Sequence, residues 1–252
     1  MKMTFSEYIQ NPAGKQNAVF SQREMYRTIY TQKLDKILLR ENNKIDYTLY
    51  TNGNEYYIHI KIPSEAIEKF YYDVVVRFFS DDNTSAVKPS LKSYNVQFFS
   101  NSPDFVFTYA HVFMEKDLFI EELKPKMSKL AVKKAANIKN PDGVVGYVKG
   151  LYFTYLIMED RGLFTKSKFN LYAKKFNKRE LLHNIENADN KIAKRQEEAI
   201  KKEKKEKRKS EPPKEKNDKI FIKPSNSVNP ITKIGTTKST KTVKRTSSIK
   251  KK

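Results

Sequence analysis

The sequence predicts an α+β fold, in which a small antiparallel sheet is flanked by N- and C-terminal helices and followed by a charged projecting helix and a disordered basic tail. Three observations predict it. Apolar residues recur at helical spacing over residues 22–40, alternate with polar residues over 45–62, and give way to a Lys-rich composition near Asn187. We therefore expect a globular body over residues 1–187, a charged helical extension over 188–211 and a disordered basic tail over 212–252.

Two early helix starts carry the spacing of a capping box, in which a hydroxyl and a carboxylate three residues later satisfy backbone donors reciprocally. Thr4 with Glu7 forms the first pattern, and Ser21 with Glu24 forms the second. Apolar residues then recur every three or four positions, which predicts a helix over residues 22–40 with one face on the core.

The next segment has the signature of a β-hairpin. Apolar and polar residues alternate over residues 45–49 and again over 56–62, and Asn52-Gly53 lies between them. An Asn-Gly pair supplies the positive φ angles of a tight turn. In this register His59 points away from the apolar face, so we expect it at the surface.

Two further strands are predicted over residues 73–79 and 94–99, because β-branched and aromatic residues suit a pleated surface. The polar loop between them, residues 80–93, contains Asp81 and Asp82. Paired acids can bind a cation, but Ser, Asn and Thr neighbours favour solvated turn residues here, and no metal site is predicted.

The second half of the body reads as helical. Ser-Pro-Asp at 102–104 and Asn-Pro-Asp at 140–142 each combine a capping residue, a Pro at the first helical position and an acid in the first turn. The second is expected to open a helix that ends near Asp160, with Gly162 as its stop.

Three glycines in this region, Gly143, Gly146 and Gly150, have helical spacing on one face. Such a smooth stripe predicts close packing of another backbone. Phosphate binding is the poorer interpretation, because no Gly-Lys-Ser/Thr follows and no strand is expected before it.

A longer and weaker helical signal covers residues 169–200 and favours a narrow apolar seam. Glu/Lys pairs at i, i+4 extend the expected helix to about Lys209, before Glu211-Pro212-Pro213. The seam residues are Leu181, Ile185, Ala188, Ile192 and Ala199.

The C-terminal region is strongly cationic and nearly devoid of aromatic residues. Residues 188–252 contain 22 Lys/Arg and eight Asp/Glu, and only Phe221 of the 31 Phe and Tyr residues. Such a segment cannot bury enough apolar surface to fold, and its charge favours a polyanion. From residue 219 onward ten basic residues occur without an acid, and we expect these to contact nucleic acid, DNA or RNA, without reading its sequence: Lys219, Lys223, Lys233, Lys238, Lys241, Lys244, Arg245, Lys250, Lys251 and Lys252.

Composition excludes several classes of site. The chain has no Cys, which rules out disulfides, thiolate nucleophiles and zinc ribbons, and its three His residues are scattered. No signature of a cofactor site or of a hydrolase triad is present, so no cofactor is predicted. An acid at Glu7 interrupts any secretory signal, and no apolar run is long enough to span a bilayer. We expect a cytoplasmic protein, or one within a virion or other nucleoprotein particle.

One constellation resembles a catalytic motif. Pro103-Asp104 and Glu122-Leu123-Lys124 are similar to the Pro-Asp…Asp/Glu-x-Lys pattern of a large nuclease superfamily. The resemblance implies that Asp104 and Glu122 hold a divalent cation, that Lys124 assists the attacking water, and that residues 117–124 form a strand. Alternatively, Asp104 is a helix-dipole partner and Glu122 faces solvent in a short helix.

The sequence as a whole favours a non-enzymatic structural or adaptor protein of a nucleoprotein assembly, with a phage virion or connector component as one concrete form. Its body would contact a protein partner or a second copy, and its arm would bind nucleic acid. A metal-dependent nuclease and a peripheral protein on an anionic membrane are the alternatives. The membrane alternative is weakened because the tail lacks apolar anchors.

Overall fold

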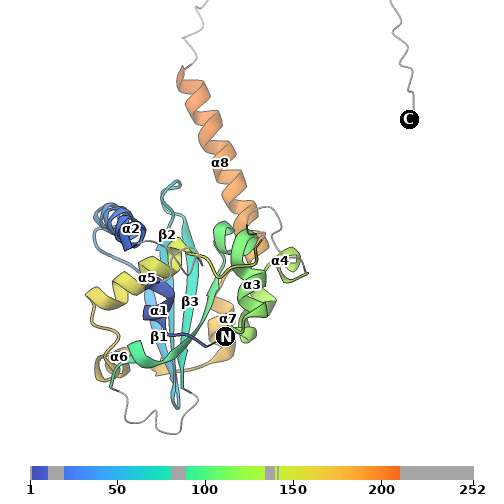
Figure 1. Ribbon diagram of the computed structural model, residues 1–252. Helices are drawn as coiled ribbons and strands as arrows, with labels where there is room; N and C mark the ends of the chain where they lie inside the picture. Colours follow the sequence, from blue (N-terminus) through green and yellow to red (C-terminus); the bar gives the residue numbers. More distant parts are fainter. Residues whose placement is uncertain (1, 11–19, 81–88, 134–139, 141, 211–252) are drawn as a thin grey trace, which may run out of the picture. The chain divides into compact units, whose positions relative to one another are not determined.

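A five-stranded sheet forms the centre of the molecule, in the order β4-β3-β2-β1-β5 (Figure 1). The computed structural model describes residues 2–10, 20–80, 89–133, 140 and 142–210. Neighbouring strands are antiparallel except β5, which pairs in parallel with β1. The strands are β1 (Tyr47–Asn52), β2 (Glu55–Pro63), β3 (Tyr71–Phe79), β4 (Asn95–Ser100) and β5 (Lys174–Lys175).

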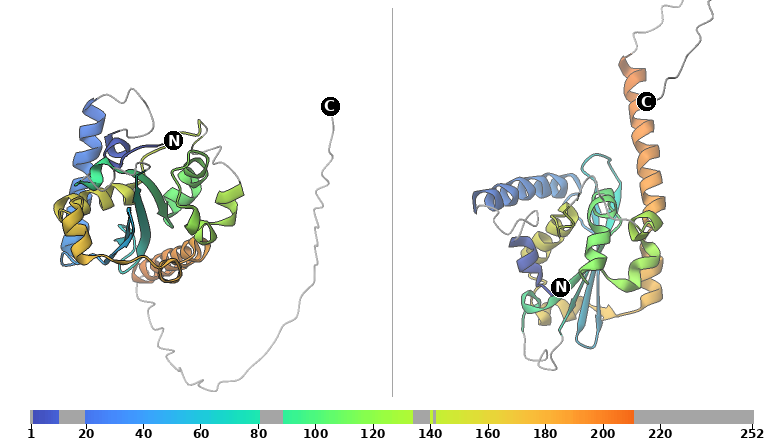
Figure 2. Two further views of the ribbon diagram at one scale, coloured as in Figure 1. Left: turned by 90° about the horizontal axis from the view of Figure 1, so that it is seen from below. Right: turned by 45° about the vertical axis from the view of Figure 1, so that its right-hand side comes forward.

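Helices pack on both sides of the sheet (Figure 2), and the expected α+β class is confirmed. The α-helices are α1 (Phe5–Gln10), α2 (Phe20–Arg40), α3 (Ala110–Glu115), α4 (Lys129–Lys133), α5 (Lys149–Asp160), α6 (Lys166–Tyr172), α7 (Lys178–Asn184) and α8 (Ala188–Ser210). Shorter turns are the 3₁₀ helices η3 (Leu91–Ser93) and η5 (Glu121–Lys126) and the π-helical turn η4 (Phe105–Tyr109).

The first helices lie close to the predicted positions. The capping box of α1 is present, because the Thr4 N–H donates to Glu7 Oε2 (2.6 Å) and the Glu7 N–H donates to Thr4 Oγ1 (3.2 Å). Helix α2 ends where predicted but begins at Phe20, so Ser21 lies inside the helix instead of preceding it.

The hairpin is confirmed, with its turn shifted by one residue. Asn52 pairs with Glu55, so Gly53 and Asn54 occupy the turn, and of these two only Gly53 has a positive φ, of 59°. The predicted strands over 73–79 and 94–99 correspond to β3 and β4. Asp81 and Asp82 lie outside the described residues.

One face of the sheet carries an aromatic core. Phe5 of α1 packs against Phe78 and Phe98, with ring centroids 6.1 and 5.2 Å apart, and Phe169 of α6 meets Tyr56 edge-on at 5.6 Å. Helix α5 contacts β2, β3 and β4, and α2 packs on α5. The even-numbered residues of β2, β3 and β4 therefore face a layer that these helices cover over most of its extent.

The opposite face is also covered, which corrects the prediction for His59. Phe176 stacks on Tyr57 with centroids 4.3 Å apart, and α7 follows it across this face. His59 is consequently buried, with 4% of its surface exposed, and bonds Asp73. Alternation placed His59 correctly on the less apolar face, but it could not show that a distant segment covers that face.

Helix α5 begins later than its predicted start. Asn140 does not cap it; its side chain instead accepts from the Val144 N–H (3.1 Å) and donates to the Thr108 carbonyl (3.3 Å). The helix ends at Asp160 as expected, and Gly162, with φ 63°, closes it.

The prediction of a glycine stripe on one helix face is therefore wrong, because Gly143 and Gly146 precede α5. At two of these glycines a side chain, not another backbone, approaches closely. A Cβ on Gly146 would lie 2.1 Å from Tyr109 Cε1, and one on Gly150 would lie 3.2 Å from Val74 Cγ2.

The long seam predicted over residues 169–200 is interrupted. The chain there forms α6, β5 and α7 before α8 begins at Ala188. Leu181, Ile185 and Ala188 are buried in the body, whereas Ala199 is exposed on α8. The three buried residues share a periodicity because each contacts the same core, although they belong to different elements. Helix α8 continues past the end of the sheet (Figure 1).

Both edges of the sheet have partners. At the β4 edge the Val96 N–H donates to the Met3 carbonyl (3.0 Å) and the Phe98 N–H donates to the Leu118 carbonyl (2.7 Å). At the other edge β5 pairs with the end of β1, and the Phe176 N–H donates to the Thr51 carbonyl (2.8 Å).

Candidate functional site

Helix α8 is joined to the sheet by a buried polar network. His59 Nε2 lies 2.9 Å from Asp73 Oδ1, and the Asn101 side-chain amide donates to Asp73 Oδ2 at 2.8 Å. The Glu186 N–H donates to the same Oδ2 (3.2 Å), and Asn101 also donates to the Glu186 carbonyl (3.1 Å). Glu186, two residues before α8, is thus hydrogen-bonded through both its N–H and its carbonyl.

Electrostatics favour the charged form of Asp73 in this network. Burial by itself raises the pKa of Asp73, but hydrogen bonds from His59, the Glu186 N–H and Asn101 outweigh it and leave the pKa below its ordinary value. A buried carboxylate that accepts several bonds is costly to disturb, so the network fixes the start of α8 firmly.

The first turns of α8 extend this attachment. Glu186 pairs with Lys191 (3.1 Å) and with Lys194, and Lys191 Nζ lies 4.5 Å from the centre of the Phe70 ring. Further along, Lys202 Nζ reaches the Ala66 carbonyl at 3.5 Å. Helix α8 therefore lies against the β2–β3 connection over about its first half.

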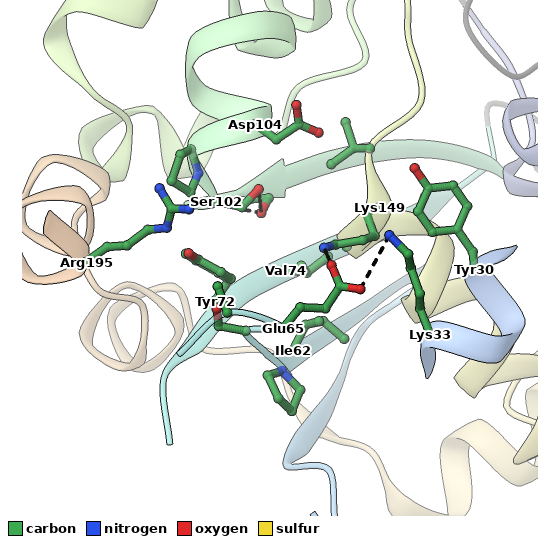
Figure 3. Close-up of a pocket in the computed structure, with 17 residues that line it drawn as sticks. Tyr30, Lys33, Ile62, Glu65, Tyr72, Val74, Ser102, Asp104, Lys149 and Arg195 are labelled. Carbon is green, nitrogen blue, oxygen red and sulfur yellow. Dashed lines mark hydrogen bonds and ion pairs between the residues drawn. The ribbon is translucent and has the colours of Figure 1, made fainter. Parts of the chain in front are cut away.

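A cavity of about 360 Å³, here called the strand-end pocket, opens beside α8 (Figure 3). It lies where β2 and β4 end and where α5 begins. Gly150 allows this arrangement, because its missing Cβ lets α5 approach Val74 of β3. The charged side chains that line the pocket are Lys33, Glu65, Asp104, Lys149 and Arg195.

The charged side chains come from five separate segments of the chain, and the basic ones outnumber the acidic ones. Glu65 binds two ammonium groups at once, because Lys33 Nζ lies 3.5 Å from one oxygen and Lys149 bonds the other. Figure 3 shows this trio on one side of the pocket and Arg195 on the other, with Asp104 between them. Three basic groups thus face two carboxylates.

Two pKa shifts describe the pocket. Burial raises the pKa of Glu65, but the hydrogen bonds and charges of Lys149 and Lys33 outweigh it, and the pKa stays below its ordinary value. Burial raises the pKa of the Tyr72 hydroxyl, and the positive charge of Arg195 offsets this only in part. At neutral pH the pocket therefore holds a charged Glu65 and a neutral Tyr72.

The residues of the nuclease-like pattern are not assembled into one site. Asp104 lines the strand-end pocket beside Val74. Glu122 lies on η5, with its Oε1 3.9 Å from Arg77 Nη1. Because Val74 and Arg77 are three residues apart on β3, their side chains point to opposite faces of the sheet.

Lys124 is also elsewhere: it is exposed and pairs with Glu121 at 3.3 Å. The strand that the nuclease resemblance implies over residues 117–124 is reduced to one bridge, between Phe98 and Phe119, followed by η5. Pro125 lies within that 3₁₀ helix. Within the described part of the chain, no group of three or more His, Asp or Glu side chains is placed to hold a metal ion.

The predicted nucleic-acid contacts, Lys219 to Lys252, lie outside the described residues. The cationic character begins earlier, since α8 contains ten Lys/Arg and five Asp/Glu. No helix of the described segments is long and apolar enough to cross a membrane.

Sequence reasoning missed both the Asp73 network and the strand-end pocket. A signal existed for the first, because an acid opening a Val-rich strand requires a buried partner. No local signal existed for the pocket, whose charged residues are spread from Lys33 to Arg195 along the chain. A scan against known protein families finds no match, and searches of curated proteins and of solved structures find none either.

Proposed function

We propose that this protein is a non-enzymatic structural or adaptor component of a nucleoprotein assembly, which binds nucleic acid through its Lys-rich C-terminal arm without sequence specificity. The observation that carries the proposal is a cationic helix with a fixed start. Helix α8 is bonded to the core through Glu186 and leads into the sequence in which ten Lys/Arg occur from residue 219 onward without an acid.

The chemistry of the arm supports contact with phosphates. Lys side chains neutralise backbone phosphates and release counterions, which yields affinity without base readout. The described lysines of α8 that lie away from the sheet, Lys201 and Lys204, are exposed, and so is Lys194. Glu residues between them moderate the charge of α8, so we expect most of the binding to come from the acid-free sequence.

The body is proposed to contact a protein partner or a second copy of the chain. Two adjacent apolar side chains near the end of α6, Leu171 and Tyr172, are 73% and 60% exposed. A phage virion or connector protein is one concrete form of this arrangement, and it would place the protein in the cytoplasm or inside a particle.

Binding of a duplex DNA without 5′ phosphates, measured across salt concentrations, tests the arm. A chain ending at Ser210 is the appropriate truncation. One ending at Asn187 would remove the buried Ala188 and the Lys191 contact with Phe70. We expect the slope of log K against log salt to fall by about 0.9 for each phosphate that the shortened chain no longer neutralises.

A matched pair of full-length variants separates the arm from general surface charge. Each removes three positive charges by Lys→Gln substitution, in the tail or on exposed positions of the body. A reduced slope in the tail variant alone supports the proposal, whereas equal slopes in both would refute it. Tighter binding to anionic vesicles than to DNA would favour the membrane alternative. The tail positions are Lys250, Lys251 and Lys252, and the body positions are Lys44, Lys61 and Lys129.

A further inference from the structure

We propose that the strand-end pocket binds a phosphate monoester that also carries hydroxyl or amino donors, which is the chemistry of a nucleotide. The ligand could be a free nucleotide or the 5′-phosphorylated end of a nucleic-acid strand. The preference for a strand end rests on the proposed function, because Arg195 belongs to the same helix that leads into the arm.

The size of the pocket suits such a ligand. Its volume of about 360 Å³ lies at the lower end of the range of small-molecule sites, roughly 300–1,000 Å³. Its walls combine apolar groups, such as Ile62 and Val74, with polar groups that converge from several elements. The sheet supports one side, because β2 and β3 stay paired up to Pro63 and Tyr71 at this end.

Unequal charge selects an anion. Lys33 and Lys149 share the single carboxylate of Glu65, so the trio has a net positive charge. Their side chains are 43% and 36% exposed, so incoming phosphate oxygens can replace water at the ammonium groups. On the opposite wall Arg195 offers a guanidinium fork, which matches two oxygens of a phosphate.

The carboxylates explain why a nucleotide is preferred over inorganic phosphate. Glu65 and Asp104 both line the pocket, and a carboxylate is able to accept hydrogen bonds but not to donate them. A bare phosphate would be repelled by them, whereas sugar hydroxyls or base amino groups can donate to them. The serine hydroxyls at the end of β4, where Ser100 Oγ donates to Ser102 Oγ at 3.1 Å, add neutral polar groups beside Asp104.

Calorimetry on the full-length protein at about 0.15 M salt, near physiological ionic strength, tests the inference. The ligands are dAMP, inorganic phosphate, and one single-stranded hexanucleotide prepared with and without a 5′ phosphate. Three variants are compared with wild type: Arg195→Gln, Glu65→Gln and, as the control, Lys204→Gln. The control removes one positive charge from an exposed position of α8 that does not line the pocket.

We expect wild type to bind the phosphorylated hexanucleotide at least about tenfold tighter than the unphosphorylated one, since a charge-assisted contact is made only by the former. Arg195→Gln should abolish this ratio and Lys204→Gln should preserve it. Glu65→Gln should strengthen the binding of inorganic phosphate more than that of dAMP, because both lysines lose their competing carboxylate while dAMP also loses a charged acceptor for its donors. A ratio near one in wild type, or weaker binding of inorganic phosphate by Glu65→Gln, would overturn the proposal.

The ligand arms distinguish the sources of the phosphate. Equal affinity for dAMP and the phosphorylated hexanucleotide would identify a free nucleotide as the ligand, and a clear preference for the hexanucleotide would identify a strand end. Inorganic phosphate binding as tightly as dAMP would contradict the role given to Glu65 and Asp104. The salt slope with unphosphorylated duplex DNA is measured in parallel. If the tail variant lowers the salt slope but wild type shows no preference for the 5′ phosphate, only the pocket proposal is rejected. If wild type prefers the 5′ phosphate but the tail variant leaves the salt slope unchanged, only the arm proposal is rejected.

Discussion

Removal of the Asp73 carboxylate should destabilise the protein strongly and loosen the start of α8. Asp73→Ala leaves three donors without their acceptor: the His59 ring, the Asn101 amide and the Glu186 N–H. Each buried donor left unsatisfied costs about 1–3 kcal/mol, so three donors would cost several kcal/mol if nothing relaxed. We expect a loss of about 3–5 kcal/mol, because part of the network can relax.

Urea unfolding followed by circular dichroism measures this loss. With a slope of about 2–3 kcal/mol per molar urea, the midpoint should fall by about 1–2.5 M. Asp73→Asn retains one acceptor oxygen and should lie between wild type and Asp73→Ala. The control, Asp46→Ala, changes an exposed acid that lies close to His59 around a surface pocket, and it should stay within about 0.5 kcal/mol.

The dependence of the free energy of unfolding on acidic pH tests the same network a second time. The pKa of Asp73 is lowered in the folded state, so its contribution is complete above the unfolded value of about 3.9 and is lost as pH falls towards the folded value. Wild type should therefore lose more stability than Asp73→Asn in that acidic window. Hydrogen exchange at the Glu186 amide should also accelerate in Asp73→Ala. A loss below about 1 kcal/mol with unchanged exchange at Glu186 would refute the reasoning.

Three further outcomes follow from the packing. Gly146→Ala should cost about 1–3 kcal/mol in urea unfolding, because the new Cβ overlaps the Tyr109 ring, and Tyr109→Leu in the same chain should recover part of the loss. Phe176→Ala should cost about 1–3 kcal/mol by removing the stack on Tyr57, and a loss below about 0.5 kcal/mol would show that β5 docks without it. Burial raises the pKa of both Tyr8 and Tyr57, so these hydroxyls stabilise the fold below about pH 10 and lose that contribution as pH rises towards their folded pKa. In an ultraviolet titration both should ionise only when the protein unfolds in alkali. Ionisation of all tyrosines before unfolding would contradict this.

Elements with strong local signals were predictable from the sequence. Strands β3 and β4 have runs of β-branched and aromatic residues, and the capping box at Thr4 needs only four residues. Helix α2 and the hairpin have helical and alternating patterns, which depend on burial of one face and which neighbouring residues reveal directly. The boundaries of these elements were predicted less accurately than the elements themselves, as the one-residue shift of the turn to Gly53 and Asn54 shows.

Predictions failed where a distant segment decides the environment. His59 is buried because residues near 176–186 cross the second face of the sheet. Asn140 has the neighbours of a helix cap, but its side chain bonds the Thr108 carbonyl of a different element. The strand-end pocket joins Lys33 to Arg195, a separation that no local periodicity can register. The cationic arm, by contrast, is predicted from the composition alone, which does not depend on the fold, and it remains a prediction.

The partners at both edges of the sheet restrict how this protein can associate. Strand addition, the route by which many sheets recruit peptides or other copies, needs exposed backbone donors along an edge strand. Here Met3 and Leu118 accept from β4, and β5 occupies the end of β1 that adjoins the turn. At these positions strand addition is blocked, so a partner of the body would have to contact side chains there instead. Copies gathered on nucleic acid, as the proposed function requires, would thus meet with these edge positions already paired.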